Sequence, residues 1–204
     1  MTAPAGEGAA AAERGRAAEE GRAAAPWGRG DYFDLGVIGA THGLSDGFAQ
    51  ILVPVLALIV ADFSLSPFQA GALLSLFSLG TFLLLPPLSM LADHTGRKKA
   101  VLIGGMGFAA LSLLAIGWAP DFETMAALAF LAGAGNACYH PCGTALAAER
   151  FPAHRAFAIS YHGLGGNVGM GIMPVVQAAI ATAAGWRAAV AACTLPAFLL
   201  LPLV

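Results

Sequence analysis

The sequence predicts an all-α integral membrane protein with six transmembrane helices packed in one bundle. Three observations lead to this fold class. The chain of 204 residues is 58% hydrophobic and only 11% charged, whereas a soluble domain carries about 25% charged residues. The apolar residues are gathered in long blocks from Leu35 onward. Nine of the ten basic residues lie in the N-terminal tail and in alternate connections between those blocks.

The N-terminal segment differs sharply from the rest of the chain. Residues 1–30 consist mostly of alanine, glycine, arginine and glutamate, and they lack the apolar core of a signal peptide. We therefore expect a disordered cytoplasmic tail over residues 1–33 and a transmembrane domain over 34–204. The net charge of -2 provides no basic patch for binding nucleic acid.

Six apolar blocks meet or approach the roughly 20 residues that a helix needs to cross a bilayer. Polar and proline-containing turns such as Asp62–Pro67 and Ala119–Asp121 separate them. The last block stays apolar up to Val204, so we expect a chain that is cut short or a fragment; the alternative is a natural end at the membrane surface. The expected helices are about 35–61, 68–92, 100–119, 124–148, 156–184 and 186–204.

The basic residues predict the orientation, because lysine and arginine stay on the cytoplasmic side of a membrane. Only Arg187 lies on the opposite side from the other nine. We therefore expect a cytoplasmic N-terminus. The membrane that we expect is a bacterial inner membrane. The nine are Arg14, Arg16, Arg22 and Arg29 in the tail, Arg97, Lys98 and Lys99 after the second block, and Arg150 and Arg155 after the fourth.

The first expected helix carries Asp46, the one acidic residue well inside an apolar block. His42 lies four residues earlier, which places both side chains on one helix face. An ionisable group in hydrocarbon is costly and usually faces a bundle interior or a water-filled cavity, and histidine titrates near neutral pH. We predict that Asp46 and His42 couple transport to protons; the alternative is a buried pair that only fixes helix packing.

The fourth expected helix carries a polar stripe formed by Asn136, Tyr139 and His140. Pro141 should kink the helix beside this stripe. A kink next to polar side chains often marks a cavity wall, so we predict that the three residues line a substrate path. The alternative is a hydrogen-bonded cluster that joins helices.

The fifth expected helix is rich in glycine. Gly165 and Gly169 form a pair of small residues suited to close helix contact, and His162 lies on the same face. Among its polar residues, His162 and Asn167 are the better candidates for a substrate path. No strand precedes these glycines, so they do not form a nucleotide-binding loop.

The three cysteines (Cys138, Cys142 and Cys193) all lie inside apolar blocks. A secreted disulfide framework is therefore not expected, and small buried cysteines are the ordinary explanation. We expect no metal site and no cofactor.

The connection after the second helix contains Asp93, Gly96, Arg97 and Lys98. Asp93 can cap the following helix and pair with Arg97. Gly96 allows a tight turn, and the basic residues can anchor the loop at the cytoplasmic lipid surface.

The segment from Ser89 to Lys99 resembles the signature of the major facilitator superfamily between its helices 2 and 3, with departures at Ser89 and His94. Further segments resemble the fosmidomycin-resistance-type branch: Thr41–Asp46 with Pro54, Gly135–Pro141, and His162–Gly169 with Pro174. No arginine precedes Arg150 in the fourth helix, so the proton-coupling arrangement of the multidrug–proton antiporter branch cannot be transferred.

The resemblance implies a twelve-helix fold of two six-helix halves, each built of three-helix inverted repeats, with substrate bound between the halves. The chain would supply the N-terminal half. The loop of Asp93, Gly96, Arg97 and Lys98 would form a cytoplasmic gate with the second half. The implied partners are the lipid bilayer, a small-molecule substrate, protons, and the missing C-terminal half or a dimer partner.

The function implied by the resemblance is secondary active transport, as proton-coupled efflux of a small organic molecule or drug by alternating access. A truncated or degenerate half without transport activity is the alternative. A membrane-embedded enzyme is a remote third, because the helices contain a single carboxylate and no zinc-protease pattern. We therefore expect a protein that is not an enzyme.

Overall fold

The computed structural model describes residues 27–204, and every element in this part of the chain is helical. Residues 1–26 of the expected tail lie outside it. Residues 29–33 were expected in the tail but belong to the first described helix. The elements are α2 (Arg29–Gln50), α3 (Leu56–Phe63), α4 (Pro67–Thr95), α5 (Lys98–Ile116), α6 (Phe122–Asn136), α7 (Tyr139–Arg150), η1 (Pro152–His154), α8 (Arg155–Thr194), α9 (Pro196–Leu200) and η2 (Leu201–Leu203).

Three helical stretches among the described residues are long and apolar enough to cross a membrane, where the sequence predicted six. They are Pro67–Thr95, Lys98–Ile116 and the 52-residue stretch Pro152–Leu203. A turn divides the fourth block into α6 and α7, which are both too short; a turn also ends α2 in the first block, and α2 is long enough but not apolar enough. The long stretch contains a break at Gly185, between the expected fifth and sixth blocks.

Proline explains both interruptions. A proline inside a helix removes one backbone hydrogen bond and its ring clashes with the carbonyl four residues earlier. Pro54 lies four residues after Gln50, where α2 ends. Pro141 lies four residues after Ala137, which directly follows the end of α6. The kink predicted at Pro141 is confirmed, and it falls one turn ahead of the proline.

Glycine with positive φ forms two of the sharp turns. Gly96 ends α4 in the left-handed region at φ 63°, as the tight-turn prediction required. Gly185 adopts φ 84° and ψ 163°, and this backbone conformation separates residues 155–184 from the helix that follows. A side chain at either position would strain the backbone.

The role predicted for Asp93 as a cap of the next helix is wrong. α4 continues to Thr95, so the Asp93 carboxylate stays in the last turn of that helix. α5 begins after Arg97 without any side-chain cap, and no Asp93–Arg97 ion pair occurs within residues 27–204. Lys98 instead pairs with Glu149 of α7 at 2.5 Å.

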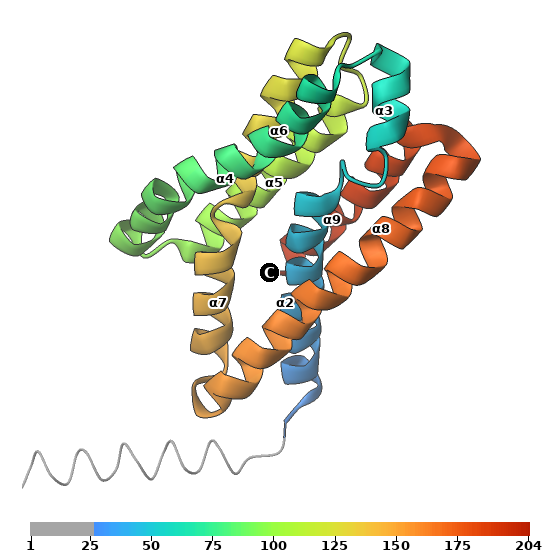
Figure 1. The fold of residues 1–204 in the computed structure, drawn as a ribbon. Helices are drawn as coiled ribbons and strands as arrows, with labels where there is room; N and C mark the ends of the chain where they lie inside the picture. The colour runs from blue at the N-terminus through green and yellow to red at the C-terminus, as the bar shows by residue number, and fades with distance from the viewer. Residues whose placement is uncertain (1–26) are drawn as a thin grey trace, which may run out of the picture.

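Two close helix crossings organise the bundle (Figure 1). α2 packs against α8, and α4 packs against α6, which also packs against α5. At the first crossing a Cβ on Gly169 would overlap the backbone of Gly43. At the second a Cβ on Gly133 would overlap the carbonyl of Phe77. The close contact predicted for Gly165 and Gly169 is thereby confirmed.

Ion pairs join the helices at both ends of the bundle. Arg150, at the end of α7, donates to Asp31 at 2.8 Å and to Asp34 at 2.6 Å near the start of α2. Figure 1 shows this end, where the α7–α8 connection lies near the first turn of α2. At the end of α3, Asp62 accepts hydrogen bonds from Trp186 at 3.0 Å and from Arg187 at 2.5 Å.

Asp62→Asn should destabilise the protein at neutral pH and leave its stability at strongly acidic pH nearly unchanged. The hydrogen bonds from Arg187 and then Trp186 lower the pKa of Asp62 below its ordinary 3.8. A lowered pKa means that the stabilisation is present above about pH 3.8 and disappears as the pH falls through the lowered value. Thermal unfolding of detergent-purified protein at several pH values, followed by Trp fluorescence, checks this. The exposed Glu123→Gln is the control, and equal stability of variant and wild type at neutral pH would contradict the expectation.

Candidate functional site

A carboxylate and two imidazoles from two helices meet where α2 passes α7. Oδ2 of Asp46 lies 3.4 Å from Nε2 of His42, one turn earlier on α2. Oδ1 of the same carboxylate lies 3.4 Å from Nε2 of His140 on α7. The Asp46 and His42 side chains are 15% and 9% exposed, whereas His140 is 47% exposed. The cluster is therefore buried on the α2 side and open on the side of His140.

His162 on α8 completes the surroundings of His42. The two rings stack with centroids 3.8 Å apart. Nδ1 of His42 lies 2.6 Å from the backbone oxygen of His162. A carbonyl can only accept, so this contact places a proton on Nδ1 of His42 and leaves Nε2 as an unprotonated acceptor when the ring is neutral.

The close approach of α8 to this cluster depends on Gly166. A Cβ there would overlap Oδ2 of Asp46 and lie 2.9 Å from Cε1 of His42. A Cβ on Gly163, one turn earlier on α8, would have no atom within 4 Å. These two glycines therefore differ in whether they leave room for the cluster.

Gly166→Ala should displace the Asp46 carboxylate or the His42 ring, whereas Gly163→Ala should displace neither. Alanine also favours a helix over glycine by about 1 kcal/mol at both positions, so propensity cannot explain a difference between the variants. NMR spectra of histidine-labelled protein check this. The His42 imidazole signals should shift in Gly166→Ala alone, and identical spectra of both variants would contradict the expectation.

Asn136 and Tyr139, both predicted to line a substrate path, are occupied by helix-to-helix hydrogen bonds. The Asn136 amide accepts from the Ser45 hydroxyl at 3.0 Å and donates to the Ser45 carbonyl at 3.3 Å. The Tyr139 hydroxyl lies 3.0 Å from the Thr41 hydroxyl. Both side chains are almost fully buried. These contacts favour the alternative, a hydrogen-bonded cluster that joins α2 to α6 and α7.

The last two path candidates have different positions. His162 is buried in the cluster, 3% exposed. Asn167 is exposed on α8, and the structure does not bring it to Asp46. Of the five predicted path residues, His140 is therefore the one that the structure places against the Asp46 carboxylate, and it is about half exposed.

Gln177 has a function in the fold that we did not predict from the sequence. Its side chain is fully buried, and its Nε2 donates to the carbonyl of Ile51 at 2.5 Å. Ile51 lies in the turn that Pro54 forces after α2, where backbone groups lose their helical partners. The available signal was an amide side chain in the apolar block 156–184, which also contains Asn167.

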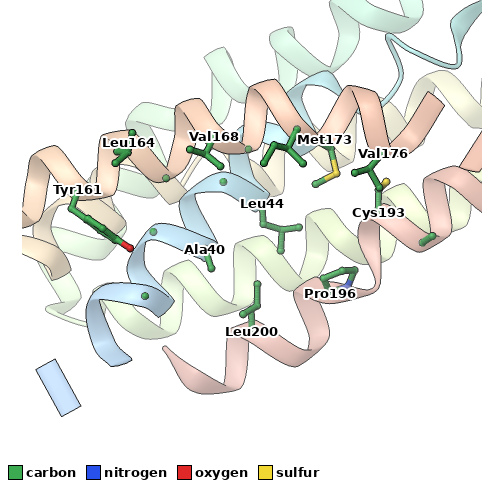
Figure 2. Close-up of a pocket in the computed structure, with 17 residues that line it drawn as sticks. Ala40, Leu44, Tyr161, Leu164, Val168, Met173, Val176, Cys193, Pro196 and Leu200 are labelled. Carbon is green, nitrogen blue, oxygen red and sulfur yellow. The ribbon is translucent and has the colours of Figure 1, made fainter. Parts of the chain in front are cut away.

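Two cavities lie near the cluster without containing the carboxylate. One groove of about 530 Å³ runs between α2, α8 and α9, lined by apolar side chains such as Leu44, Val168 and Leu200 (Figure 2). It has no charged group and includes none of the predicted site residues. A second cavity of about 580 Å³ contacts Tyr139 and Thr41 and has Asp34 and Arg150 among its lining residues. We therefore assign the candidate site to the polar cluster rather than to the apolar groove.

The long apolar helices and the carboxylate held between them define a helical membrane protein. The chain belongs to the Major Facilitator Superfamily, because a sequence model of that family matches residues 38–204. The family prediction made from the Ser89–Lys99 motif is thereby confirmed.

Three relatives with curated names match at low identity. The chain is 27% identical over 154 residues to YfnC, an uncharacterized MFS-type transporter of Bacillus subtilis, covering 76% of this chain and 37% of the relative. It is 28% identical over 146 residues to the fosmidomycin resistance protein of Escherichia coli, covering 72% and 36%. It is 31% identical over 140 residues to the multidrug efflux pump LfrA of Mycolicibacterium smegmatis, covering 68% and 28%. The matched regions thus span little more than a third of these relatives, or less.

Proposed function

We propose that the chain is the N-terminal half of a secondary active transporter that exports a small organic molecule in exchange for protons. The observation that carries the proposal is the Asp46 carboxylate, held inside the bundle between His42 and His140. A carboxylate at such a depth is costly unless it has a partner or a function. Two relatives, named for fosmidomycin resistance and multidrug efflux, support export as the direction.

The cluster has the parts that a proton site needs. The Asp46 side chain is largely shielded from solvent, and the imidazoles of His42 and His140 face its carboxylate. His140 is about half exposed and contacts the carboxylate directly, which gives protons a route from solvent to Asp46. Imidazole exchanges protons near neutral pH. The proposed sequence is uptake through His140, occupancy of Asp46, and release when the bundle rocks to the other side.

The helix packing supports alternating access by inverted repeats. The α2–α8 and α4–α6 crossings both place a glycine against a neighbouring backbone. The helices α2 and α8 belong to the first and fifth blocks, and α4 and α6 to the second and fourth. If the fourth block repeats the first and the fifth repeats the second, the α2–α8 contact in one arrangement corresponds to the α6–α4 contact in the other. A proline break interrupts the first and fourth blocks alike. We propose six spans on this basis, with each interrupted block crossing the bilayer as one kinked span.

The charged loops support a cytoplasmic N-terminus in the bacterial inner membrane. The ion pairs of Lys98 and Arg150 bring three expected cytoplasmic segments to one end of the bundle. Asp93 and Arg97 are exposed beside them. We propose that this loop forms the gate with the other half of the transporter, supplied by the rest of the protein or by a second copy.

The surface supports a lipid environment for the helices. Large apolar side chains are exposed along α4, as expected where a helix faces acyl chains rather than water. Those on α4 include Phe68, Leu79, Phe82, Leu83 and Met90.

The test is proton-coupled export by the complete gene product in inside-out membrane vesicles. The vesicles are energised to form a pH gradient, which is followed with a pH-sensitive dye, and fosmidomycin is the probe. Fosmidomycin should accumulate only while the gradient exists and should partly dissipate it. Accumulation that does not depend on the gradient, or none above vesicles lacking the protein, would overturn the proposal.

A further inference from the structure

The cluster of Asp46, His42 and His140 has a geometry that a proton site does not require. Its three donor atoms, one from each residue, all lie within 4.8 Å of one another. Nε2 of His42 lies 3.4 Å from Oδ2 of Asp46, and Nε2 of His140 lies 3.4 Å from the other carboxylate oxygen, Oδ1. Hydrogen bonds between nitrogen and oxygen fall at about 2.7–3.2 Å. Both separations are therefore slightly longer than the usual hydrogen bond between an imidazole and a carboxylate.

That separation suits a metal ion placed between them. Zinc bonds to histidine nitrogen and to carboxylate oxygen at about 2.0–2.2 Å in tetrahedral geometry. Two donors on such an ion stand about 3.3–3.5 Å apart by the tetrahedral angle. The two measured separations of 3.4 Å fall in this range. The His140 side chain is about half exposed, so its nitrogen can move toward an ion held by the carboxylate and His42.

The tautomer of His42 is the one that a metal ligand needs. Its Nδ1 proton is directed to the backbone oxygen of His162 at 2.6 Å. A metal-binding histidine almost always donates its other ring N–H to such an acceptor, which fixes the ring and the tautomer. Nε2 then presents its lone pair to the lone pairs of Asp46.

The same nitrogen is buried and unsatisfied. The His42 side chain is 9% exposed, and Nε2 has no hydrogen-bond partner among the described residues. A buried polar atom without a partner destabilises the fold. An acceptor that faces a second acceptor is satisfied by a cation between them, and the 3.4 Å separation, longer than the usual N–H···O distance, leaves room for a metal ion.

We propose that His42, Asp46 and His140 form a binding site for a divalent transition-metal ion such as Zn²⁺. Two imidazoles and one carboxylate suit zinc, cobalt, nickel, copper and iron, and do not suit Mg²⁺ or Ca²⁺. Three protein ligands leave a coordination position open, and the exposed side of His140 gives access to it. The site departs from the sequence-based expectation of no metal, because its ligands come from helices far apart in the chain. It does not depend on the proposed export function.

The test uses tag-free chain purified in detergent and titrated with Co²⁺, whose visible absorption reports coordination by nitrogen and oxygen. One equivalent should bind with the intense bands of a tetrahedral site, and Zn²⁺ should displace it while Mg²⁺ should not. His42→Ala and His140→Ala should each weaken binding by at least about tenfold. His94→Ala, at an exposed histidine outside the cluster, should bind like wild type.

Folding is separated from ligation by circular dichroism and thermal unfolding of each variant. His140→Ala removes a half-exposed side chain, so its fold should be retained even if His42→Ala is unstable. Wild-type protein that binds no Co²⁺, or Co²⁺ binding that a folded His140→Ala variant keeps unchanged, would overturn the metal site. The titration needs no gradient, so protein that binds Co²⁺ but exports nothing would overturn only the proposed function.

Discussion

Replacing Gly169 with leucine should prevent α8 from packing against α2, whereas leucine at Gly171 should leave the fold intact. A Cβ at Gly169 would overlap the Cα, carbonyl carbon and carbonyl oxygen of Gly43, which are backbone atoms and cannot move aside as a flexible side chain would. Gly171 is exposed on the same helix, and its Cβ would have no atom within 4 Å. Both variants introduce the same side chain with the same helix propensity, so a difference in their stability reports the close packing of α8 against α2.

We expect Gly169→Leu to lower the free energy of unfolding by about 3 kcal/mol, the upper end of the range for overpacked sites. Separation of the two helices would also remove the stacking of His42 on His162, because the cluster lies beside the crossing. Thermal unfolding of detergent-purified protein, followed by size-exclusion chromatography, measures the effect. If Gly169→Leu and Gly171→Leu unfold at the same temperature, the close crossing does not determine the stability of the bundle.

Much of the fold can be predicted from the sequence, because the membrane allows few alternatives to a helix for a long apolar block. A backbone in hydrocarbon must satisfy its own hydrogen bonds, so long apolar blocks become helices. Pro141 predicted the break near α7, and Gly165 and Gly169 predicted a close contact of α8. The partners of those glycines, Gly39 and Gly43, were not predicted, because pairing between distant helices leaves no periodic signal in either one.

The number of spans shows where block length alone fails. An apolar block long enough to cross a membrane need not be one helix, because Pro54 and a turn split the first block. Conversely, two blocks can merge into one helical stretch, as 152–203 does around Gly185. In each case the backbone conformation at one residue determines where a helix ends, whereas hydropathy is an average over the whole block.

The site was predicted in part for similar reasons. The spacing of His42 and Asp46 placed them on one face, and the structure has them 3.4 Å apart. Their approach to His140 could not be derived from spacing, because it depends on how α2 and α7 pack. The hydrogen-bond roles of Asn136 and Tyr139 depend on Ser45 and Thr41, two small hydroxyl residues that gave no signal of their own.

Asp46→Asn should abolish proton-coupled export while leaving the fold intact. Asparagine has nearly the same shape and can hydrogen-bond to His42 or His140, but it carries neither the negative charge nor an exchangeable carboxyl proton. Glu123→Gln, the same chemical change at an exposed position in the first turn of α6, is the matched control.

The measurement is dye-reported proton movement in vesicles that contain equal amounts of each complete protein. Asp46→Asn should give the signal of vesicles without the protein, and Glu123→Gln should give that of wild type. Fosmidomycin efflux down its own concentration gradient separates coupling from translocation, because it requires no proton. If Asp46→Asn retains this passive movement but no longer responds to the pH gradient, the carboxylate serves coupling. If the variant still moves protons with its cargo, the proton site is elsewhere, and Asp46 acts in helix packing or in holding a metal ion.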